Sequence, residues 1–305
     1  MDNCQLYQMD VLSDIDVCED TVFIFAPSNE DRAMKTFDEH IQEASIYSIV
    51  AIKYPGVVIP DRILQKASPD RVHIISITDS PIDFLTSLKE LSNEYGSKHI
   101  IVDITCIRIP EMFTLIKYLK TKMGISSLGI LYSVPYDYVF SQEPFTSYHS
   151  YLGDLDMYEL LGFGGTTNTQ DPDLYIFLGF EESLALKVFE DCKHKELKLV
   201  NNLPSFSIKY KDICAINNYQ LMKQSSDAFF TPADNPFETY NFLDQMIDKT
   251  CPVCIAPLST KPIALGVCLF AIDNDFVRVV YPVSKQYNQN TTINTYNTLF
   301  YQIIF

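Results

Sequence analysis

The sequence predicts an α/β protein that contains the same kind of half twice, each half with a mostly parallel sheet. The first observation is a repeat: residues 23–37 (FIFAPSNEDRAMKTF) align without a gap with residues 175–189 (YIFLGFEESLALKVF). The same spacing separates Pro110 from Pro262, and each proline follows an apolar stretch and precedes a helical pattern. The second observation is that strand and helix patterns alternate in both halves, as in doubly wound sheets. Internal repeats of this length indicate a duplicated unit with pseudo-two-fold symmetry.

The first half reads as strands linked by helices. Continuous apolar runs, typical of strands covered on both faces, predict the strands, and apolar residues at helical spacing predict the helices. The expected strands are residues 21–26, 46–53, 72–77, 99–104 and 128–133, and the expected helices are 30–44, 81–95 and 110–122.

The second half repeats this plan. Its expected strands are residues 174–179, 196–200, 252–257 and 277–282, its expected helices are 182–191, 213–223, 236–249 and 262–271, and residues 291–305 are expected to add an edge strand. Both halves are therefore predicted to be Rossmann-like.

Composition shifts divide the chain into four segments. Residues 1–20 are acidic, without Lys or Arg, and residues 134–171 are rich in Tyr, Ser, Pro, Gly and Thr. We expect residues 1–20 to be an acidic N-terminal segment, 21–133 the first half, 134–171 a linker and 172–305 the second half.

The bulk properties exclude several functions. The 305 residues carry a formal net charge of −16, which disfavours non-specific binding to nucleic acids and to anionic membranes. The longest apolar run is too short to cross a bilayer, and no signal peptide is recognised. We expect a cytoplasmic protein whose 8 cysteines are reduced.

The candidate site consists of four turns that follow strands, two in each half. In open parallel sheets, ligands bind beyond the carboxyl ends of the strands, where helix N-termini present N–H groups. The candidate ligand-binding residues of these turns are Ser28, Asn29, Glu30, Arg32, Asp103, Thr105, Arg108, Gly179, Glu182, Ser259, Thr260 and Lys261.

The turn before Pro262 is the most specific of the four. Ser259 and Thr260 can cap a helix, and Lys261 supplies a cation, so the turn can hold a phosphate or a carboxylate. A capped helix with a solvated lysine is the alternative. Thr105 and Arg108 repeat the hydroxyl and the cation in the first half, and this recurrence keeps the ligand interpretation open.

Catalytic and metal sites are not indicated. Glu30 and Glu182 open helices, which favours a structural role for their carboxylates, although either one or Asp103 could act as an acid–base group in an enzyme. The 5 histidines show no metal spacing, and Cys251 with Cys254 forms a lone C-x-x-C motif that favours neither zinc nor a redox pair. No metal and no cofactor are predicted.

The segment APLSTKPIALGVCLFAI (256–272) resembles the strand, turn and helix of the CRISPR-associated Rossmann-fold (CARF) sensors and of the related SAVED domains. It keeps Thr260 and Lys261 but has Leu258 and Ser259 where that family has glycines, and VDITCIRIPEMFTLI (102–116) is a more remote match. The resemblance implies a cyclic nucleotide or oligonucleotide bound between the halves, in prokaryotic antiviral defence, with a partner protein as effector.

The predicted function is therefore a sensor of a small anionic, nucleotide-type ligand that acts through a protein partner. Two alternatives stay open. The chain could be an acidic, non-catalytic subunit that docks on a basic partner, or an enzyme that processes a nucleotide.

Overall fold

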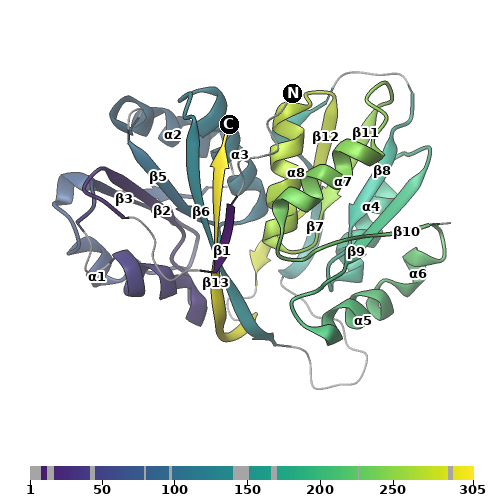
Figure 1. The fold of residues 1–305 in the computed structure, drawn as a ribbon, viewed down its shortest axis with the longest axis horizontal. Coiled ribbons are helices and arrows are strands. Elements are labelled where there is room, and N and C mark those ends of the chain that lie inside the picture. Colours follow the sequence, from purple (N-terminus) through teal and green to yellow (C-terminus); the bar gives the residue numbers. More distant parts are fainter. Residues whose placement is uncertain are drawn as a thin grey trace. The chain divides into compact units, whose positions relative to one another are not determined.

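The computed structural model describes residues 8–11, 17–41, 45–78, 80–95, 98–139, 151–165, 170–225, 227–287 and 291–305. The chain forms two compact units. Unit 1 contains Met1–Val139 together with Gln289–Phe305, and unit 2 contains Phe140–Asn288. Each unit is a mixed α/β layer structure around its own sheet, as the sequence predicts (Figure 1).

The sheet of unit 1 has seven strands in the order β1-β13-β6-β5-β2-β3-β4. The strands from β6 to β4 are parallel, β13 is antiparallel to β6, and β1 is antiparallel to β13. Their bounds are β1 Gln8–Val11, β2 Thr21–Phe25, β3 Ser48–Lys53, β4 Val72–Ser76, β5 His99–Asp103, β6 Ser127–Tyr138 and β13 Thr292–Ile304.

Short helical turns cover one face of this sheet, and two long helices lie on the other face. Phe23 and Phe25 of β2 pack against Phe37 and Ile41, and the ring of Phe25 stacks on that of Phe37. The covering elements are η2 Asp31–Met34, η3 Phe37–Ile41 (a π-helical turn), α1 Asp61–Leu64 and η4 Pro69–Arg71, followed by the long helices α2 Pro81–Tyr95 and α3 Ile109–Thr121.

The sheet of unit 2 has six strands in the order β10-β9-β8-β11-β12-β7. The strands from β10 to β12 are parallel, and β7 is antiparallel to β12. Their bounds are β7 Tyr151–Gly164, β8 Asp173–Phe177, β9 Leu197–Asn202, β10 Ala228–Thr231, β11 Val253–Pro257 and β12 Val277–Tyr287.

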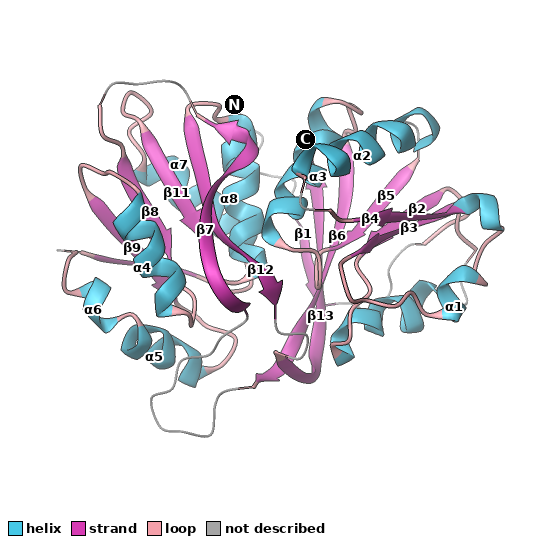
Figure 2. Ribbon diagram, turned by 180° about the vertical axis from the view of Figure 1, so that it is seen from behind, coloured by secondary structure: helices cyan, strands magenta, loops and turns pink. Residues whose placement is uncertain are grey.

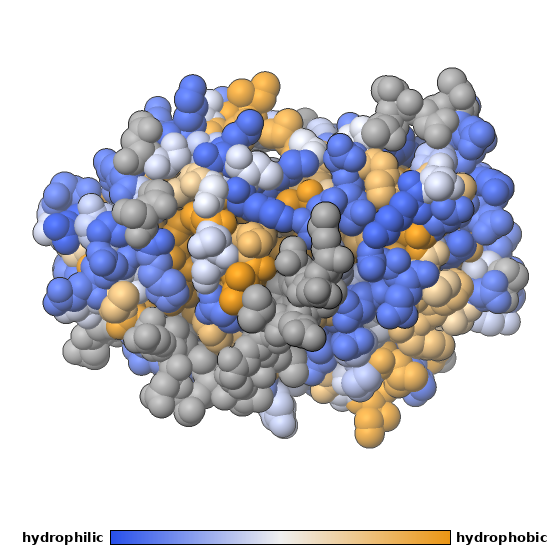
Figure 3. Space-filling model, turned by 45° about the horizontal axis from the view of Figure 1, so that its top comes forward, coloured by the Kyte–Doolittle hydropathy of each residue, from blue (hydrophilic) through white to orange (hydrophobic). Residues whose placement is uncertain are grey.

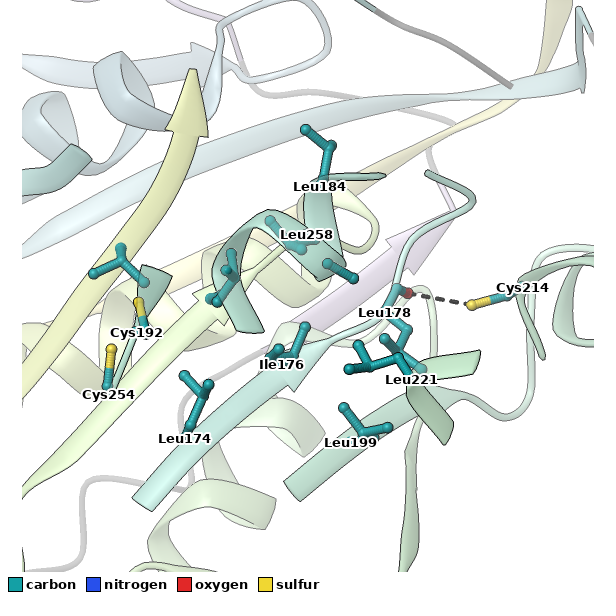
Figure 4. Close-up of a cluster of buried hydrophobic side chains, with 14 residues drawn as sticks. Leu174, Ile176, Leu178, Leu184, Cys192, Leu199, Cys214, Leu221, Cys254 and Leu258 are labelled. Carbon is teal, nitrogen blue, oxygen red and sulfur yellow. Dashed lines mark hydrogen bonds between the residues drawn. The ribbon is translucent and has the colours of Figure 1, made fainter. Parts of the chain in front are cut away.

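Helices cover both faces of the sheet of unit 2 (Figure 2). On one face, Leu174 and Ile176 of β8 pack with Leu184 and Val188 of α4 in one buried cluster (Figure 4). On the other face, the ring of Phe177 contacts Phe242 of α7. The helices are α4 Glu182–Asp191, α5 Ile208–Asn217, α6 Tyr219–Met222, α7 Pro236–Met246 and α8 Lys261–Asp273.

The two units share one topology. In each, the central strand is the first of the parallel set, the next two strands follow on one side, and the fourth and fifth lie on the other. The order in which strands are added therefore changes side between β2 and β5 in unit 1 and between β8 and β11 in unit 2, although these strands are parallel. These are the topological switch points of the two sheets, where open α/β sheets bind ligands. Helices α3 and α8 follow the switch strands, and each has a proline near its start.

The sixth strand of each repeat lies in the sheet of the other repeat. In sequence order, β7 follows the parallel strands of unit 1, yet it pairs with β12 of unit 2. In the same way β13 follows the parallel strands of unit 2, yet it pairs with β6 of unit 1. The two repeats therefore exchange their last strands, which occupy equivalent places in the two sheets.

This exchange corrects the expected segment boundaries. Strand β6 extends to Tyr138, and the predicted linker 134–171 contains strand β7 of unit 2, while its residues 140–150 and 166–169 lie outside the described residues. Leu155 and Met157 pack on the buried cluster of unit 2 while Asp154 is exposed, so this segment alternates as a half-buried strand does. Residues 291–305, expected at the edge of the second half, lie in unit 1 between β1 and β6. The acidic segment 1–20 contributes β1, while residues 1–7 and 12–16 are not described.

The gapless sequence alignment does not match the packing of the aligned strands. It pairs Phe23 with Tyr175, but Phe23 faces the helical turns that follow its own strand. Tyr175 instead donates a hydrogen bond to the carbonyl of Met246 at the end of α7, on the face opposite α4. Because successive side chains of a strand point to opposite faces, the structural correspondence of β2 and β8 is shifted by an odd number of residues.

Besides β1 and β7, further local differences from the sequence predictions concern helices and one short strand. The expected helix 30–44 is broken into η2 and η3, with residues 42–44 not described, and the expected helix 213–223 is divided into α5 and α6 around Asn218. Strand β10, which was not predicted, has only four residues, AFFT. Its length is too short to show the two-residue period of a strand.

The surface is mostly polar. Figure 3 shows hydrophilic residues over most of the described part of one face, with hydrophobic residues in scattered patches. Within the described residues, no helix is both long and apolar enough to cross a lipid bilayer.

Candidate functional site

The candidate turns meet at the switch point of each sheet. In unit 1 the turns of Glu30 and Thr105 follow β2 and β5, which are neighbouring parallel strands. In unit 2 the turns of Gly179 and Ser259 follow β8 and β11, which are also neighbours. The structure therefore brings the predicted residues together as two clusters, one at the carboxyl edge of each sheet.

A close approach of two backbones builds the unit 2 cluster. A Cβ atom on Gly179 would lie 2.3 Å from the carbonyl oxygen of Leu258. The amide of Leu258 in turn donates to the carbonyl of Phe177, at 3.1 Å. Gly179 was predicted to bind a ligand, and the structure gives it a packing role: only glycine lets the turn after β8 lie against the turn after β11.

The variant Gly179→Ala is expected to lower the free energy of unfolding by about 1–3 kcal/mol, the usual cost of forcing extra atoms into a packed site. The atom in the way belongs to the backbone of Leu258, so it cannot move aside as a side chain can. Urea denaturation measures the loss. Unchanged stability would mean that the two turns do not approach this closely.

The hydroxyl groups of Ser259 and Thr260 are engaged within unit 2. Ser259 Oγ donates to Oδ1 of Asn202 at 2.8 Å, and Thr260 Oγ1 donates to the carbonyl of Ala233 at 2.6 Å. Thr260 is the N-cap residue of α8, but neither its side chain nor any other caps that helix. The prediction that these hydroxyls cap α8 is therefore wrong, and they instead bind this turn to the ends of β9 and β10.

Helix α8 begins at this turn without a side-chain cap. Lys261 is its first residue and is partly exposed, and α4, which begins at Glu182, also lacks a side-chain cap. By contrast, Asn235 caps α7, because its Oδ1 accepts from the amides of Phe237 (3.0 Å) and Glu238 (3.3 Å). The positive dipole end of α8 thus lies beside the switch point, next to a lysine.

Buried polar residues that sequence reasoning missed lie at the same edge. Asn202 and Thr231 end β9 and β10, and Asn218 Nδ2 donates to the carbonyl of Gly179 at 2.8 Å. Among the described residues, Asn218 Oδ1 and Thr231 Oγ1 are buried and have no hydrogen-bond partner. The only sequence signal was Asn201-Asn202 at the end of an apolar strand, since buried polar groups need a reason to be there.

An ion pair fills the unit 1 cluster. The side chains of Glu30 and Arg32 are 10% and 9% exposed, and Arg32 Nε donates to Glu30 Oε2 at 2.8 Å. The hydroxyls of Thr291 and Thr292 also donate to the Glu30 carboxylate. Arg32 Nη1 further donates to the carbonyl of Ser133 at 3.1 Å.

This environment keeps both side chains charged. Burial raises the pKa of Glu30, but the charge of Arg32 and the hydrogen bonds from Thr291 and Thr292 outweigh it, so the pKa lies below its ordinary value. Burial lowers the pKa of Arg32, but Tyr132 and Glu30 raise it well above its ordinary value. A general acid needs a raised pKa, so the lowered pKa of Glu30 does not suit that role, and its contacts are those of a structural ion pair.

The other unit 1 residues are also held by neighbours. Asp103 Oδ1 accepts from the amide of Thr105 at 2.9 Å, and the hydroxyl of Thr105 accepts from the amide of Ser133 at 2.8 Å. The amide of Arg108 donates to the hydroxyl of Tyr54 at 2.8 Å, and its guanidinium lies over the Tyr54 ring.

Ser28 shapes the first turn of unit 1. Its Oγ accepts from the amide of Glu30 at 3.1 Å, and Asn29 between them is exposed. Of the basic residues predicted for a ligand, Arg32 is thus engaged with Glu30, Arg108 is the N-cap residue of α3, and Lys261 is the first residue of α8.

The described residues show neither a metal cluster nor a paired C-x-x-C motif. Within the described residues, no three His, Cys, Asp or Glu side chains come together as a metal site. The two cysteines of the C-x-x-C motif have different neighbours. Cys251 Sγ donates to Asp248 Oδ2 at 3.8 Å, whereas the Cys254 thiol lies beside the thiol of Cys192.

No protein-family model matches the chain, and no curated protein does.

Proposed function

We propose that this protein binds a small anionic ligand of the nucleotide type at the switch point of unit 2. The observation that carries the proposal is the start of α8: a helix N-terminus without a side-chain cap, which begins with Lys261 at the junction of β8 and β11. Backbone amides and a cation at a helix N-terminus bind phosphate groups.

The surrounding residues support a polar ligand. Gly179 lets the two turns meet, and Asn202 and Ala233 hold the turn of Ser259 and Thr260 in place. A turn that is fixed before binding costs less conformational entropy when the ligand arrives. With a net charge of −16 on the chain, an anion needs a local cation such as Lys261.

From the resemblance to the CARF and SAVED sensors, we propose that the ligand is a cyclic nucleotide or a short oligonucleotide. Thr260 and Lys261 carry that resemblance, and both lie at the proposed site. A role in antiviral defence, through a partner protein that responds to the ligand, belongs to the same proposal.

Calorimetric titration with inorganic phosphate and with cyclic di- and trinucleotides tests the proposal. We expect a nucleotide to bind, and Lys261→Ala to weaken it about 10- to 100-fold, the usual effect of losing a hydrogen bond from a charged group. Lys249→Ala is the matched control. It removes the same charge at a surface lysine that pairs with Asp244 and precedes β11, and it should leave affinity unchanged.

Three outcomes separate the alternatives. Binding that Lys261→Ala does not weaken places the ligand elsewhere, and no binding by any nucleotide of the panel contradicts the proposal. Conversion of the ligand during the titration, detected by chromatography of the recovered sample, would favour a nucleotide-processing enzyme.

A further inference from the structure

Two thiols and a guanidinium lie at the opposite edge of the unit 2 sheet from the proposed ligand site. Cys254 is the second residue of β11, and Arg278, the second residue of β12, is its partner in the parallel register. Cys192 ends α4 as its C-cap residue. Figure 4 shows the sulfur atoms of Cys192 and Cys254 side by side.

The three side chains contact one another. Figure 4 shows the sulfur atoms of Cys192 and Cys254 next to each other within one buried cluster, and Arg278 Nη2 donates to Cys254 Sγ at 3.6 Å. Cys192 is 5% exposed and Cys254 is fully buried, while Arg278 is partly exposed. Among the described residues, Nε of Arg278 is buried without a hydrogen-bond partner, and the charges near its guanidinium come from the two thiols and from Glu159 of β7.

The contacts make the two thiols unequal. The neighbouring Cys254 thiol, followed by the charge of Arg278, lowers the pKa of Cys192 below its ordinary value although burial opposes this. The neighbouring Cys192 thiol, together with burial, raises the pKa of Cys254. Cys192 is therefore the first of the pair to become a thiolate, and the thiolate is the nucleophilic form of cysteine.

We propose that Cys192 and Cys254 form a redox-active dithiol that a hydroperoxide oxidises to a disulfide. The Cys192 thiolate attacks one peroxide oxygen, the O–O bond breaks, and hydroxide leaves, which gives a sulfenic acid at Cys192. The sulfur of Cys254 then attacks the Cys192 sulfur and loses its proton, and the hydroxyl group leaves as water. Overall, two thiols and one hydrogen peroxide give one disulfide and two waters.

The bond would cross-link two elements that also reach the proposed ligand site. Helix α4 begins at Glu182 and ends beside Cys192, and β11 contains Cys254 and ends at Pro257 just before the Ser259 turn. Oxidation fixes the far ends of both elements to each other. The inference itself stands on the thiol geometry and does not need the ligand.

Peptide mass spectrometry of the full chain tests the inference. The native protein is treated with a small excess of hydrogen peroxide, unfolded, and alkylated with N-ethylmaleimide before digestion. We expect a Cys192–Cys254 cross-linked peptide that dithiothreitol converts back to two alkylated peptides. Cys214 is the matched buried thiol. Burial raises its pKa to about 12, and it donates to the carbonyls of Leu178 and Gly179, so it should remain fully alkylated.

Two variants of Arg278 test the cation. Arg278→Gln should slow disulfide formation severalfold, because the charge of Arg278 contributes to the lowered pKa of Cys192 and its loss leaves less of the nucleophilic thiolate. Arg278→Lys keeps the charge and should retain most of the rate, which separates the electrostatic effect from a packing defect. Circular dichroism checks that both variants are folded.

The inference is overturned if Cys192 and Cys254 remain alkylated while the exposed Cys18 is oxidised in the same sample. It is also overturned if Arg278→Gln forms the disulfide as fast as the unmodified chain.

Discussion

Replacing Gly266 with alanine is expected to lower the free energy of unfolding by about 2–3 kcal/mol, in the upper range for overpacking. Gly266 lies in the middle of α8, where a Cβ atom would be 2.2 Å from the carbonyl oxygen of Pro236 and 2.7 Å from Cβ of Thr239. Both atoms belong to α7, so the two helices cross in contact at this glycine. Alanine favours the helix by about 1 kcal/mol over glycine, which offsets only part of the cost of separating them.

Urea denaturation of Gly266→Ala, followed by circular dichroism, measures this loss. Gly129→Ala is the matched control, because its new methyl group would meet side-chain atoms of Phe300 at 3.0 Å and Ile101 at 3.3 Å, which can shift. We expect a smaller loss there. Equal midpoints for Gly266→Ala and the unmodified chain would show that α7 and α8 do not meet at Gly266.

Removing Arg32 is expected to destabilise unit 1 by about 3–5 kcal/mol, the cost of leaving one partner of a buried ion pair without the other. In Arg32→Ala the Glu30 carboxylate keeps its contacts with Thr291 and Thr292 but loses the cation that offsets its burial. Its pKa should then rise, because burial is no longer opposed by a neighbouring positive charge.

The sign of the pH dependence follows from the lowered pKa of Glu30. In the unmodified chain this carboxylate contributes stability above its unfolded value of about 4.5, and the contribution is lost as the pH falls through its folded pKa. In Arg32→Ala the carboxylate is instead protonated more readily in the folded state. The difference in stability between the two proteins should therefore be large at pH 7 and should shrink as the pH falls below about 5.

A double-mutant cycle isolates the pair. Glu30→Gln in the Arg32→Ala background removes the uncompensated charge, so the double variant should be more stable than the sum of the two single effects predicts. Additive effects would mean that Glu30 and Arg32 do not interact in the folded protein.

The architecture was accessible from the sequence because its signals are local. Apolar runs such as residues 21–26 predicted the central strands, and the repeat predicted that the second unit would copy the first. The partners of β7 and β13 were not accessible, because the pairing of distant strands leaves no local pattern. Leu155, Asp156 and Met157 do alternate as a strand should, but their acidic and glycine-rich surroundings resemble a loop.

The positions of the candidate turns could be predicted, but the contacts of their side chains could not. A strand end followed by a helix start can be located from Pro257 and Pro262, and the switch points lie where those turns were expected. The hydrogen-bond partners of the hydroxyl groups come from residues far away in the sequence. Thr260, for example, donates to the carbonyl of Ala233. C-x-x-C spacing likewise could not indicate that Cys192 and Cys254, which are far apart in the sequence, lie next to each other.

The crossing of β7 and β13 has an evolutionary consequence. An ancestral homodimer whose subunits exchanged their last strands would give this connectivity once its gene was duplicated and the two copies were fused. After such a fusion neither copy could be deleted without loss to the other, since each supplies a strand to the other's sheet. The equivalent turns are then free to differ: Arg108 ends the turn after β5, and Lys261 follows the equivalent turn after β11.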